Sequence, residues 1–276
     1  MDPRAEQIND KYIDIEKILA AKRVKVSRPV VRLLERILCV PQLNKGIYYD
    51  REYFGLDFAQ KFLEGHDEQD LNITIKCVGE ENIPLDGNPL VVGNHPLGGP
   101  DGLALMSAVG RVRRDIKFPV NDFLLYLPGL KELFVPIDKV NRSRALASLE
   151  EAFAAPGTLL YFPAGMCSRL QKGVIKDLEW KATFIKKAVK YHRDVVPVYI
   201  AARNRSRFYR LANLRKWLGI KFNFEMALLP SEMFAQRGKT FTLTFGKPIP
   251  WQTFDNSRTA AQWAQWMKDQ VYQLGS

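Results

Sequence analysis

The sequence contains few cysteines and few histidines. Its three cysteines, Cys39, Cys77 and Cys167, lie far apart and form no C-x-x-C pair, so the sequence indicates neither a disulfide framework nor a cysteine zinc site. This use of cysteine is typical of proteins in a reducing compartment. The three histidines include no H-E-x-x-H motif and no pair at helical spacing, and we therefore expect no metal site.

Long hydrophobic runs are also missing. Residues 1–23 are too rich in charge to supply the apolar part of a signal peptide. The longest uncharged stretch, residues 152–168, is interrupted by two prolines and two glycines, whereas a membrane-spanning helix needs about 20 mainly apolar residues. We therefore expect a cytoplasmic protein whose membrane contact is peripheral, on the inner face of the cytoplasmic membrane.

Acidic residues are the smaller charged class, because 30 Asp+Glu stand against 41 Lys+Arg and the net charge is +11. Such a balance predicts an anionic partner. Near the N-terminus, a run without acidic residues precedes a helical pattern with one apolar face. A basic amphipathic helix of this kind can lie on an anionic membrane surface, although packing against the protein's own core explains the same pattern. The basic residues are Lys22, Arg23, Lys25 and Arg28, and the apolar face consists of Val30, Leu33, Leu34, Ile37 and Leu38.

A second basic tract, residues 195–224, also contains no acidic residue. Its arginines and lysines are interleaved with aromatic side chains, a mixture that nucleic-acid binding predicts. A surface that meets lipid headgroups or the phosphopantetheine arm of an acyl carrier has the same composition, and a solvated basic face is the plainest alternative. Because the chain has no zinc-finger, RRM or KH signature, nucleic acid ranks last among these partners.

The distribution of hydrophobic residues changes near residue 70. Residues 1–70 show helical periodicity without a clear strand, and we interpret them as an N-terminal helical appendage that associates with a membrane. In residues 71–276, β-rich runs alternate with helical ones, which predicts an α/β domain with a mixed, largely parallel sheet flanked by helices. The expected strands are 71–78, 89–94, 116–121, 133–137, 158–163, 195–202 and 239–246, and the expected helices are 101–109, 122–133, 141–155, 178–192 and 259–274.

His95 is the histidine best placed for chemistry. It follows an apolar strand and enters the turn HPLGGPDG, and ligands of α/β sheets bind where strands end. Asp101 can orient one nitrogen of the imidazole and leave the other free as a base, with backbone N–H groups near Gly98, Gly99 or Gly165 as donors to an oxyanion. The alternative is a buried histidine in a turn and an aspartate that caps a helix. The other two histidines, at positions 66 and 192, lie in polar surroundings where a solvated imidazole is expected.

Four sequence blocks, in order, resemble the glycerolipid acyltransferases that esterify lysophosphatidic acid and related lysolipids. NHPLGGPD resembles the histidine-aspartate signature, with five residues between His95 and Asp101 where the family usually has four. LFVPIDKVNR, YFPAGMCSR and VVPVYI resemble the second, third and fourth blocks. The likeness covers residues 75 to about 250 and is strongest to the bacterial hemolysin-like branch, which is related to ornithine and glycine lipid O-acyltransferases.

This resemblance implies transfer of an acyl group from acyl carrier protein or CoA to a lysolipid, without a further cofactor. It implies that His95 is the general base and that Asp101 orients it. In the third block, Ala164 and Cys167 stand where the family usually has Glu and Arg, so we expect an acceptor other than a phosphate-bearing one, such as an amino-acid lysolipid, unless Arg169 or Lys139 restores a phosphate contact. The resemblance assigns substrate binding to Asn94, Gly98, Gly99, Lys139, Arg142, Gly165, Ser168, Arg169 and Pro197.

Other functions remain open from the residues alone. The histidine-aspartate pair can also activate water on an acyl thioester, which makes a hydrolase the nearest alternative. Cys167 or Ser168 can in principle form an acyl-enzyme, although neither lies in a G-x-S-x-G elbow. A non-enzymatic protein that binds anionic lipid or nucleic acid is the third class.

Overall fold

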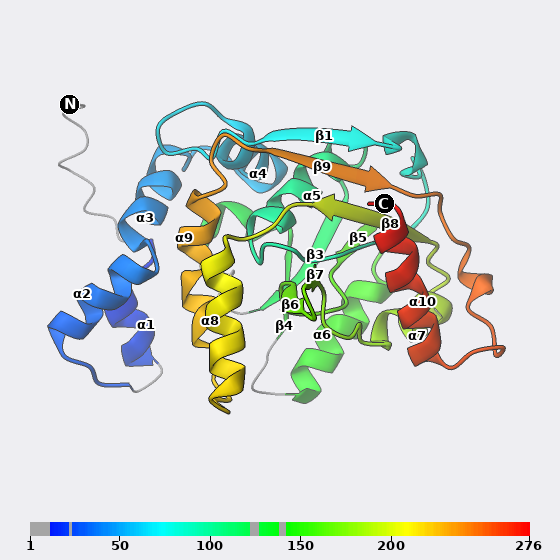
Figure 1. Ribbon diagram of the computed structural model, residues 1–276. Coiled ribbons are helices and arrows are strands. Elements are labelled where there is room, and N and C mark those ends of the chain that lie inside the picture. The colour runs from blue at the N-terminus through cyan, green and yellow to red at the C-terminus, as the bar shows by residue number, and fades with distance from the viewer. Residues whose placement is uncertain (1–11, 22–23, 122–126, 138–141) are drawn as a thin grey trace.

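In a computed structural model that describes residues 12–21, 24–121, 127–137 and 142–276, the chain forms a central sheet between helices (Figure 1). Seven strands in the described residues pair in the order β1-β9-β8-β2-β5-β3-β4. All neighbours are parallel except β8 and β9, so the predicted mixed, largely parallel sheet is confirmed. The strands are β1 (Thr74–Val78), β2 (Leu90–Gly93), β3 (Ile116–Asn121), β4 (Phe134–Ile137), β5 (Thr158–Tyr161), β8 (Val195–Ala201) and β9 (Thr240–Phe245), with a separate hairpin of β6 (Arg169–Gln171) and β7 (Val174–Lys176).

Helices cover both faces of the sheet because successive strand side chains point to opposite sides. On β2, Val91 joins the cluster that contains α4 and α5, whereas Leu90 and Val92 join the cluster of α6, α7 and α10. The result is a three-layer α/β arrangement. The helices are α1 (Ile15–Ala21), α2 (Arg28–Ile37), α3 (Val40–Tyr49), α4 (Gly55–Glu64), α5 (Pro100–Gly110), α6 (Arg142–Ala154), α7 (Thr183–Lys190), α8 (Ser206–Trp217), α9 (Leu229–Phe234) and α10 (Ala260–Gln273).

The N-terminal helices pack onto the α/β layers through apolar side chains. Val31 of α2, Ile47 of α3 and Phe58 of α4 belong to the same hydrophobic cluster as α5 and the sheet. The amide of Asn44 bonds both the N–H and the carbonyl of Ile13, at 2.7 and 3.0 Å, which holds the start of α1 against α3. Within the described residues, no helix is long and apolar enough to cross a membrane.

Two expected helices differ from the structure. The helix expected over 122–133 falls partly outside the described residues, and its described part contains only a 3-10 turn at Pro128–Leu130, because proline and glycine disfavour a helix interior. A Cβ on Gly129 would lie 2.5 Å from the Phe58 ring, so the turn packs closely against α4. The helix expected over 178–192 runs only from Thr183 to Lys190, and residues 177–181 before it have no regular secondary structure.

Candidate active site

His95 lies two residues after the end of β2 and donates from its side chain to a buried carboxylate. Its Nδ1 lies 2.9 Å from Oδ2 of Asp101, whose side chain is fully buried. Because a carboxylate at this position accepts a hydrogen bond, Nδ1 carries the proton and Nε2 is the unprotonated nitrogen of the neutral imidazole. The side chain of Asn94 bonds both the N–H and the carbonyl of Ile200 and thereby fixes the end of β2 to β8.

The Asp101 carboxylate also organises the turn between β2 and α5. Its two oxygens accept the backbone N–H groups of Leu97, Gly98, Gly99 and Gly102 at 2.8 to 3.2 Å. Burial raises the pKa of Asp101, but the charge and hydrogen bond of His95 and the N–H groups of Leu97 and Gly98 lower it by more, so that the pKa lies below its ordinary value. The N-cap of α5 is Gly99, so Asp101 is not the capping residue; it lies in the first turn of the helix. From there its carboxylate accepts N–H groups of the turn and orients the imidazole at the same time.

These hydrogen bonds correct one expectation about the oxyanion donors. The N–H groups of Gly98 and Gly99 donate to Asp101, and that of Gly165 donates to the carbonyl of Phe162 at 3.1 Å. The buried charge of Asp101 requires these donors, because an ionised carboxylate without partners is costly inside a protein. None of the three N–H groups is left free for a substrate oxygen.

Gly98 accommodates the extra residue of the motif. Its φ is +91°, a conformation that residues other than glycine rarely adopt. A Cβ at this position would lie 2.8 Å from Cδ1 of Leu229 and 3.3 Å from Cys167. The turn can therefore span five residues between His95 and Asp101 and still bring their side chains together.

A second buried carboxylate, Asp177, supports His95 from its backbone side. It accepts the His95 N–H at 3.2 Å, the Ser168 hydroxyl at 2.6 Å and the Trp180 indole N–H at 2.9 Å. The sequence does not indicate a role for Asp177, since no motif surrounds position 177 and 82 residues separate it from His95. Burial lowers the pKa of His95, but Asp101 and then Asp177 raise it, so that the pKa lies above its ordinary value.

The His95 ring stacks on Phe162, with ring centroids 4.4 Å apart, and faces an open pocket. This pocket has a volume of about 220 Å³. Its described lining includes one Lys, Lys181, at the side of the pocket where Gly165 lies; a Cβ on Gly165 would lie 3.4 Å from the lysine Nζ. The lining consists of His95, Gly98, Gly99, Gly102, Phe118, Pro119, Val120, Ile137, Leu149, Tyr161, Phe162, Gly165 and Lys181.

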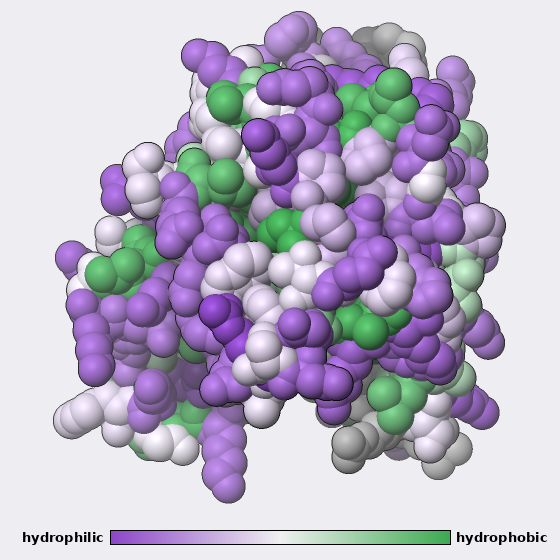
Figure 2. Space-filling view, turned by 90° about the vertical axis from the view of Figure 1, so that its right-hand side faces the viewer, coloured by the Kyte–Doolittle hydropathy of each residue, from purple (hydrophilic) through white to green (hydrophobic). Residues whose placement is uncertain are grey.

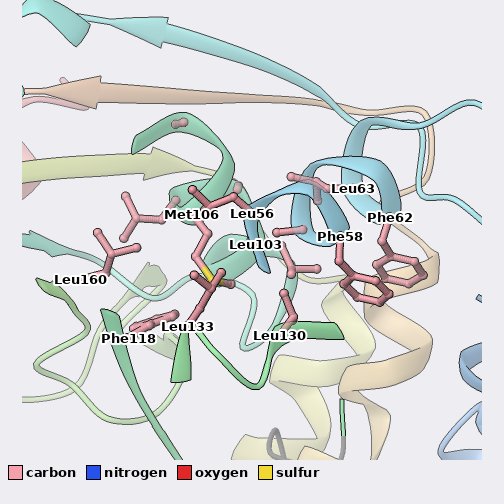
Figure 3. Packing of buried hydrophobic residues seen from close by; sticks show 14 of the residues in the cluster. Leu56, Phe58, Phe62, Leu63, Leu103, Met106, Phe118, Leu130, Leu133 and Leu160 are labelled. Carbon is pink, nitrogen blue, oxygen red and sulfur yellow. The ribbon is translucent and has the colours of Figure 1, made fainter. Parts of the chain in front are cut away.

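A second pocket lies directly beside the first and is almost entirely apolar. Both pockets are lined by Gly99, Gly102 and Phe118. From there the second pocket extends between α3, α4 and α5, where Phe58, Phe62, Leu103, Met106, Phe118 and Leu130 form part of its wall (Figure 3). The arrangement places a polar reaction centre next to an apolar space.

The structure separates the expected substrate-binding residues into three groups. Gly98, Gly99 and Gly165 line the His95 pocket. Asn94 and Ser168 lie behind the pocket in hydrogen bonds within the protein, and Pro197 is buried in β8 opposite Val92. Lys139 lies outside the described residues, and Arg142 begins α6 with a side chain that also lies outside them.

Arg169, which sequence analysis assigned to a substrate phosphate, is buried in an internal ion pair. Its NH2 group lies 3.1 Å from Oε1 of the fully buried Glu225, and its NH1 group donates to the carbonyl and the sulfur of Cys167 at 2.7 and 3.0 Å. Its guanidinium also lies 5.0 Å from the Phe208 ring centroid. The arginine is therefore already occupied within the protein, which corrects the expectation that it binds substrate.

The geometry also argues against an acyl-enzyme. Cys167 is fully buried, and burial raises the pKa of its thiol to about 11, so the thiolate is scarce at neutral pH. Ser168 is 2% exposed and donates to Asp177.

Among the described residues, no group of three or more His, Cys, Asp or Glu side chains is arranged to hold a metal ion. His66 and His192 are both exposed, as expected.

Comparison with known proteins identifies close relatives. The profile of a family described as "Acyltransferase" matches residues 19–275. A lyso-glycine lipid O-acyltransferase of Phocaeicola vulgatus is 47% identical over 269 residues, which cover 95% of each chain. A protein of the same name from Bacteroides thetaiotaomicron is 46% identical over 95% of this chain and 97% of its own. The solved structure of a 1-acyl-sn-glycerophosphate acyltransferase from Thermotoga maritima is 20% identical, with a TM-score of 0.49 over 95% of this chain and 88% of its own.

Proposed function

This chain belongs to the acyltransferase family, and we propose that it transfers a fatty acyl group from a thioester of acyl carrier protein or CoA to the hydroxyl of a lyso-glycine lipid. The observation that carries the proposal is the His95–Asp101 pair, which faces a pocket that adjoins an apolar one. The two lyso-glycine lipid O-acyltransferases that match nearly the whole chain support the acceptor.

In the proposed reaction, His95 is the general base and Asp101 orients it. Nε2 of His95 accepts the proton of the acceptor hydroxyl while the hydroxyl oxygen forms a bond to the thioester carbonyl carbon. The tetrahedral intermediate then collapses, the C–S bond breaks, and the imidazolium returns its proton to the leaving thiolate. An ester and a free thiol result, and no protein nucleophile or metal takes part.

The apolar pocket, whose volume is about 80 Å³, is the expected site for the part of the donor's fatty chain next to the thioester. Its wall is made of aliphatic and aromatic side chains from α3, α4 and α5, and burial of each CH₂ group contributes about 0.8 kcal/mol. Because Gly99, Gly102 and Phe118 border both pockets, a chain in the apolar pocket can present its thioester carbonyl beside His95.

The head group of the acceptor is expected to bind at Lys181. A glycine head group that is linked through its amino group keeps one carboxylate, which needs a single cation rather than the arginine fork that suits a phosphate. Lys181 is exposed in the His95 pocket and has no ion-pair partner in the described part of the chain. Arg169, by contrast, is already paired with Glu225.

Competition between two acceptors tests the proposed specificity. When the protein is incubated with labelled acyl-CoA or acyl carrier protein and equal amounts of lyso-glycine lipid and lysophosphatidic acid, we expect a preference of roughly tenfold or more for lyso-glycine lipid in kcat/KM. The measurement follows both esters and free fatty acid. Preferred use of lysophosphatidic acid would refute the acceptor, and release of fatty acid that does not depend on acceptor would favour the hydrolase.

A variant of Lys181 tests the carboxylate contact. Lys181→Gln is expected to raise KM for lyso-glycine lipid about tenfold and to leave KM for the acyl donor unchanged, because only the acceptor carries the carboxylate. Lys186→Gln is the matched control, since Lys186 is also exposed but lies on α7 outside the pocket lining. Equal effects of the two variants on acceptor KM would contradict this role of Lys181.

The lipid acceptor requires access to a membrane, and we propose peripheral binding to an anionic membrane surface through the region of α2. Val24, Val26, Val30 and Leu33 are exposed there, between 39% and 56%. Basic side chains beside them, including Arg28 and Arg32, favour anionic lipid. Lys22 and Arg23 of the predicted basic run lie outside the described residues.

A further inference from the structure

The second basic tract ends in a turn that exposes a group of large apolar side chains. We define the α8 tip as residues 214–222, the last turn of α8 and the loop that follows it. Trp217 is 80% exposed and Phe222 is 78% exposed. Leu214, Leu218 and Ile220 are exposed as well, between 40% and 53%. Side chains of this size are normally buried when they have no external partner, and a cluster of them marks an interaction site.

Hydrogen bonds within the protein hold the α8 tip in shape. Arg215 donates from NH1 to the carbonyl of Ile220 at 2.7 Å, and its Nε lies 2.9 Å from Oε2 of the buried Glu225. The Ile220 N–H in turn donates to the carbonyl of Arg215 at 3.1 Å. Gly219 makes the reversal of the chain with a φ of +69°. The apolar side chains of the tip therefore project from a fixed turn.

The charge around the α8 tip is positive. Lys216 and Lys221 are exposed within it, and the sequence has no acidic residue from Val195 to Phe224. Tryptophan settles at the boundary between lipid headgroups and acyl chains, and neighbouring lysines are attracted to anionic headgroups. A soluble acidic protein would satisfy the lysines but would not require a projecting tryptophan and phenylalanine. The chemistry thus fits an anionic lipid surface better than an acidic protein.

The position of the α8 tip relative to α2 agrees with this partner. The end of α8 and the chain that leads into α2 both reach the lower edge of the molecule in Figure 1. The end of α8 and the chain that leads into α2 can therefore approach one flat surface from the same edge. The side shown in Figure 2, by contrast, is largely hydrophilic and has only scattered apolar residues.

We propose that the α8 tip is a second membrane anchor, which inserts Trp217 and Phe222 into the headgroup region of an anionic bilayer while α2 binds at a separate point. The proposal rests on the proposed function only in the choice of a lipid surface as the partner. Two anchors at one edge restrict the orientation of the protein on the bilayer. They hold the protein against the lipid in which the acceptor resides.

Sedimentation with vesicles of 30% phosphatidylglycerol and 70% phosphatidylcholine tests the anchor. The double variant Trp217→Ser/Phe222→Ser is expected to bind at least about tenfold more weakly than the unchanged protein, because both insertions are lost. Leu85→Ser is the matched control, since Leu85 is 74% exposed outside the tip. Vesicle binding of the double variant equal to that of the control would overturn the proposal.

Fluorescence gives a second measurement that does not depend on affinity. The protein has five tryptophans, and among them Trp217 is exposed whereas Trp180 and Trp263 are buried. A blue shift on addition of vesicles is expected in the unchanged protein and absent in Trp217→Phe, which keeps an apolar side chain for binding. A shift that persists in Trp217→Phe would also overturn the proposal.

Activity on a soluble, short-chain acceptor separates this proposal from the proposed function. The double variant is expected to keep normal kcat and KM for that acceptor with acyl-CoA, since neither residue lines the pockets. If the unchanged protein has no transferase activity but the vesicle results hold, the function fails and the anchor stands. If the double variant binds vesicles normally and loses activity only with acyl carrier protein, the tip is a protein-docking surface and the anchor is refuted.

Discussion

Replacing His95 with alanine is expected to lower kcat by about 10²–10⁴-fold while the protein remains folded, the range typical for loss of a general base. The methyl group cannot accept the hydroxyl proton, and Asp101 keeps the four N–H groups of its turn. Single-turnover ester formation, with the lyso-glycine lipid acceptor saturating, measures the effect. Near-normal turnover in a folded variant would end the proposed mechanism.

The pH profile distinguishes a base oriented by Asp101 from an imidazole with a structural role. Because the pKa of His95 lies above its ordinary value, the neutral base forms only as pH rises, and kcat/KM should increase through that pKa. Asp101→Asn removes the charge that raises the pKa, so the acidic limb of the profile should move to lower pH while turnover falls. Phe118→Leu is the control: it changes the pocket wall but keeps the His95–Asp101 pair intact. The acidic limb of its pH profile should therefore stay at the same pH as in the unchanged protein.

The central sheet could be predicted from the sequence because its strands are short, apolar and regularly spaced. The run Leu90–Gly93 is buried on both faces. A continuous apolar run predicts such a strand without knowledge of the strands that pair with it. The region around Pro128 could not be predicted in the same way. Its apolar run predicts a helix, but Pro128 and Gly129 disfavour a helix interior. The 3-10 turn that forms instead packs Gly129 closely against Phe58, a contact that exists only in the folded chain.

In the functional site, too, local contacts could be predicted from the sequence and long-range contacts could not. The His95–Asp101 pair lies within one turn, so local sequence suffices to predict its hydrogen bond. Asp177 and Lys181 reach the site from a segment more than 80 residues away, and their positions depend on how the folded chain brings that segment, between β7 and α7, to His95. The sequence does predict a place for Phe162 in the site, because this residue follows the strand Thr158–Tyr161 and residues at the ends of strands approach the ligand.

Arg169 illustrates how sequence position misleads when burial is unknown. It lies two residues after the position where the family usually has a phosphate-binding arginine, and this proximity predicts that it replaces that arginine. In the folded chain the arginine holds Glu225, which also lies 2.9 Å from Arg215. Arg169 and Glu225 are both buried, and neither lines the pocket that contains His95.

Arg169→Met is accordingly expected to destabilise the protein by about 3 kcal/mol and to leave acceptor preference unchanged. Removal of one partner of a buried ion pair typically costs 3–5 kcal/mol, and Arg215 still compensates the Glu225 charge, which favours the lower value. Urea unfolding monitored by fluorescence measures the free energy of unfolding. Arg210→Met is the control, because Arg210 is exposed on α8 and surface substitutions change stability by about 0.5 kcal/mol or less. Unchanged stability together with a loss of activity towards lysophosphatidic acid alone would show instead that Arg169 binds the phosphate of that acceptor.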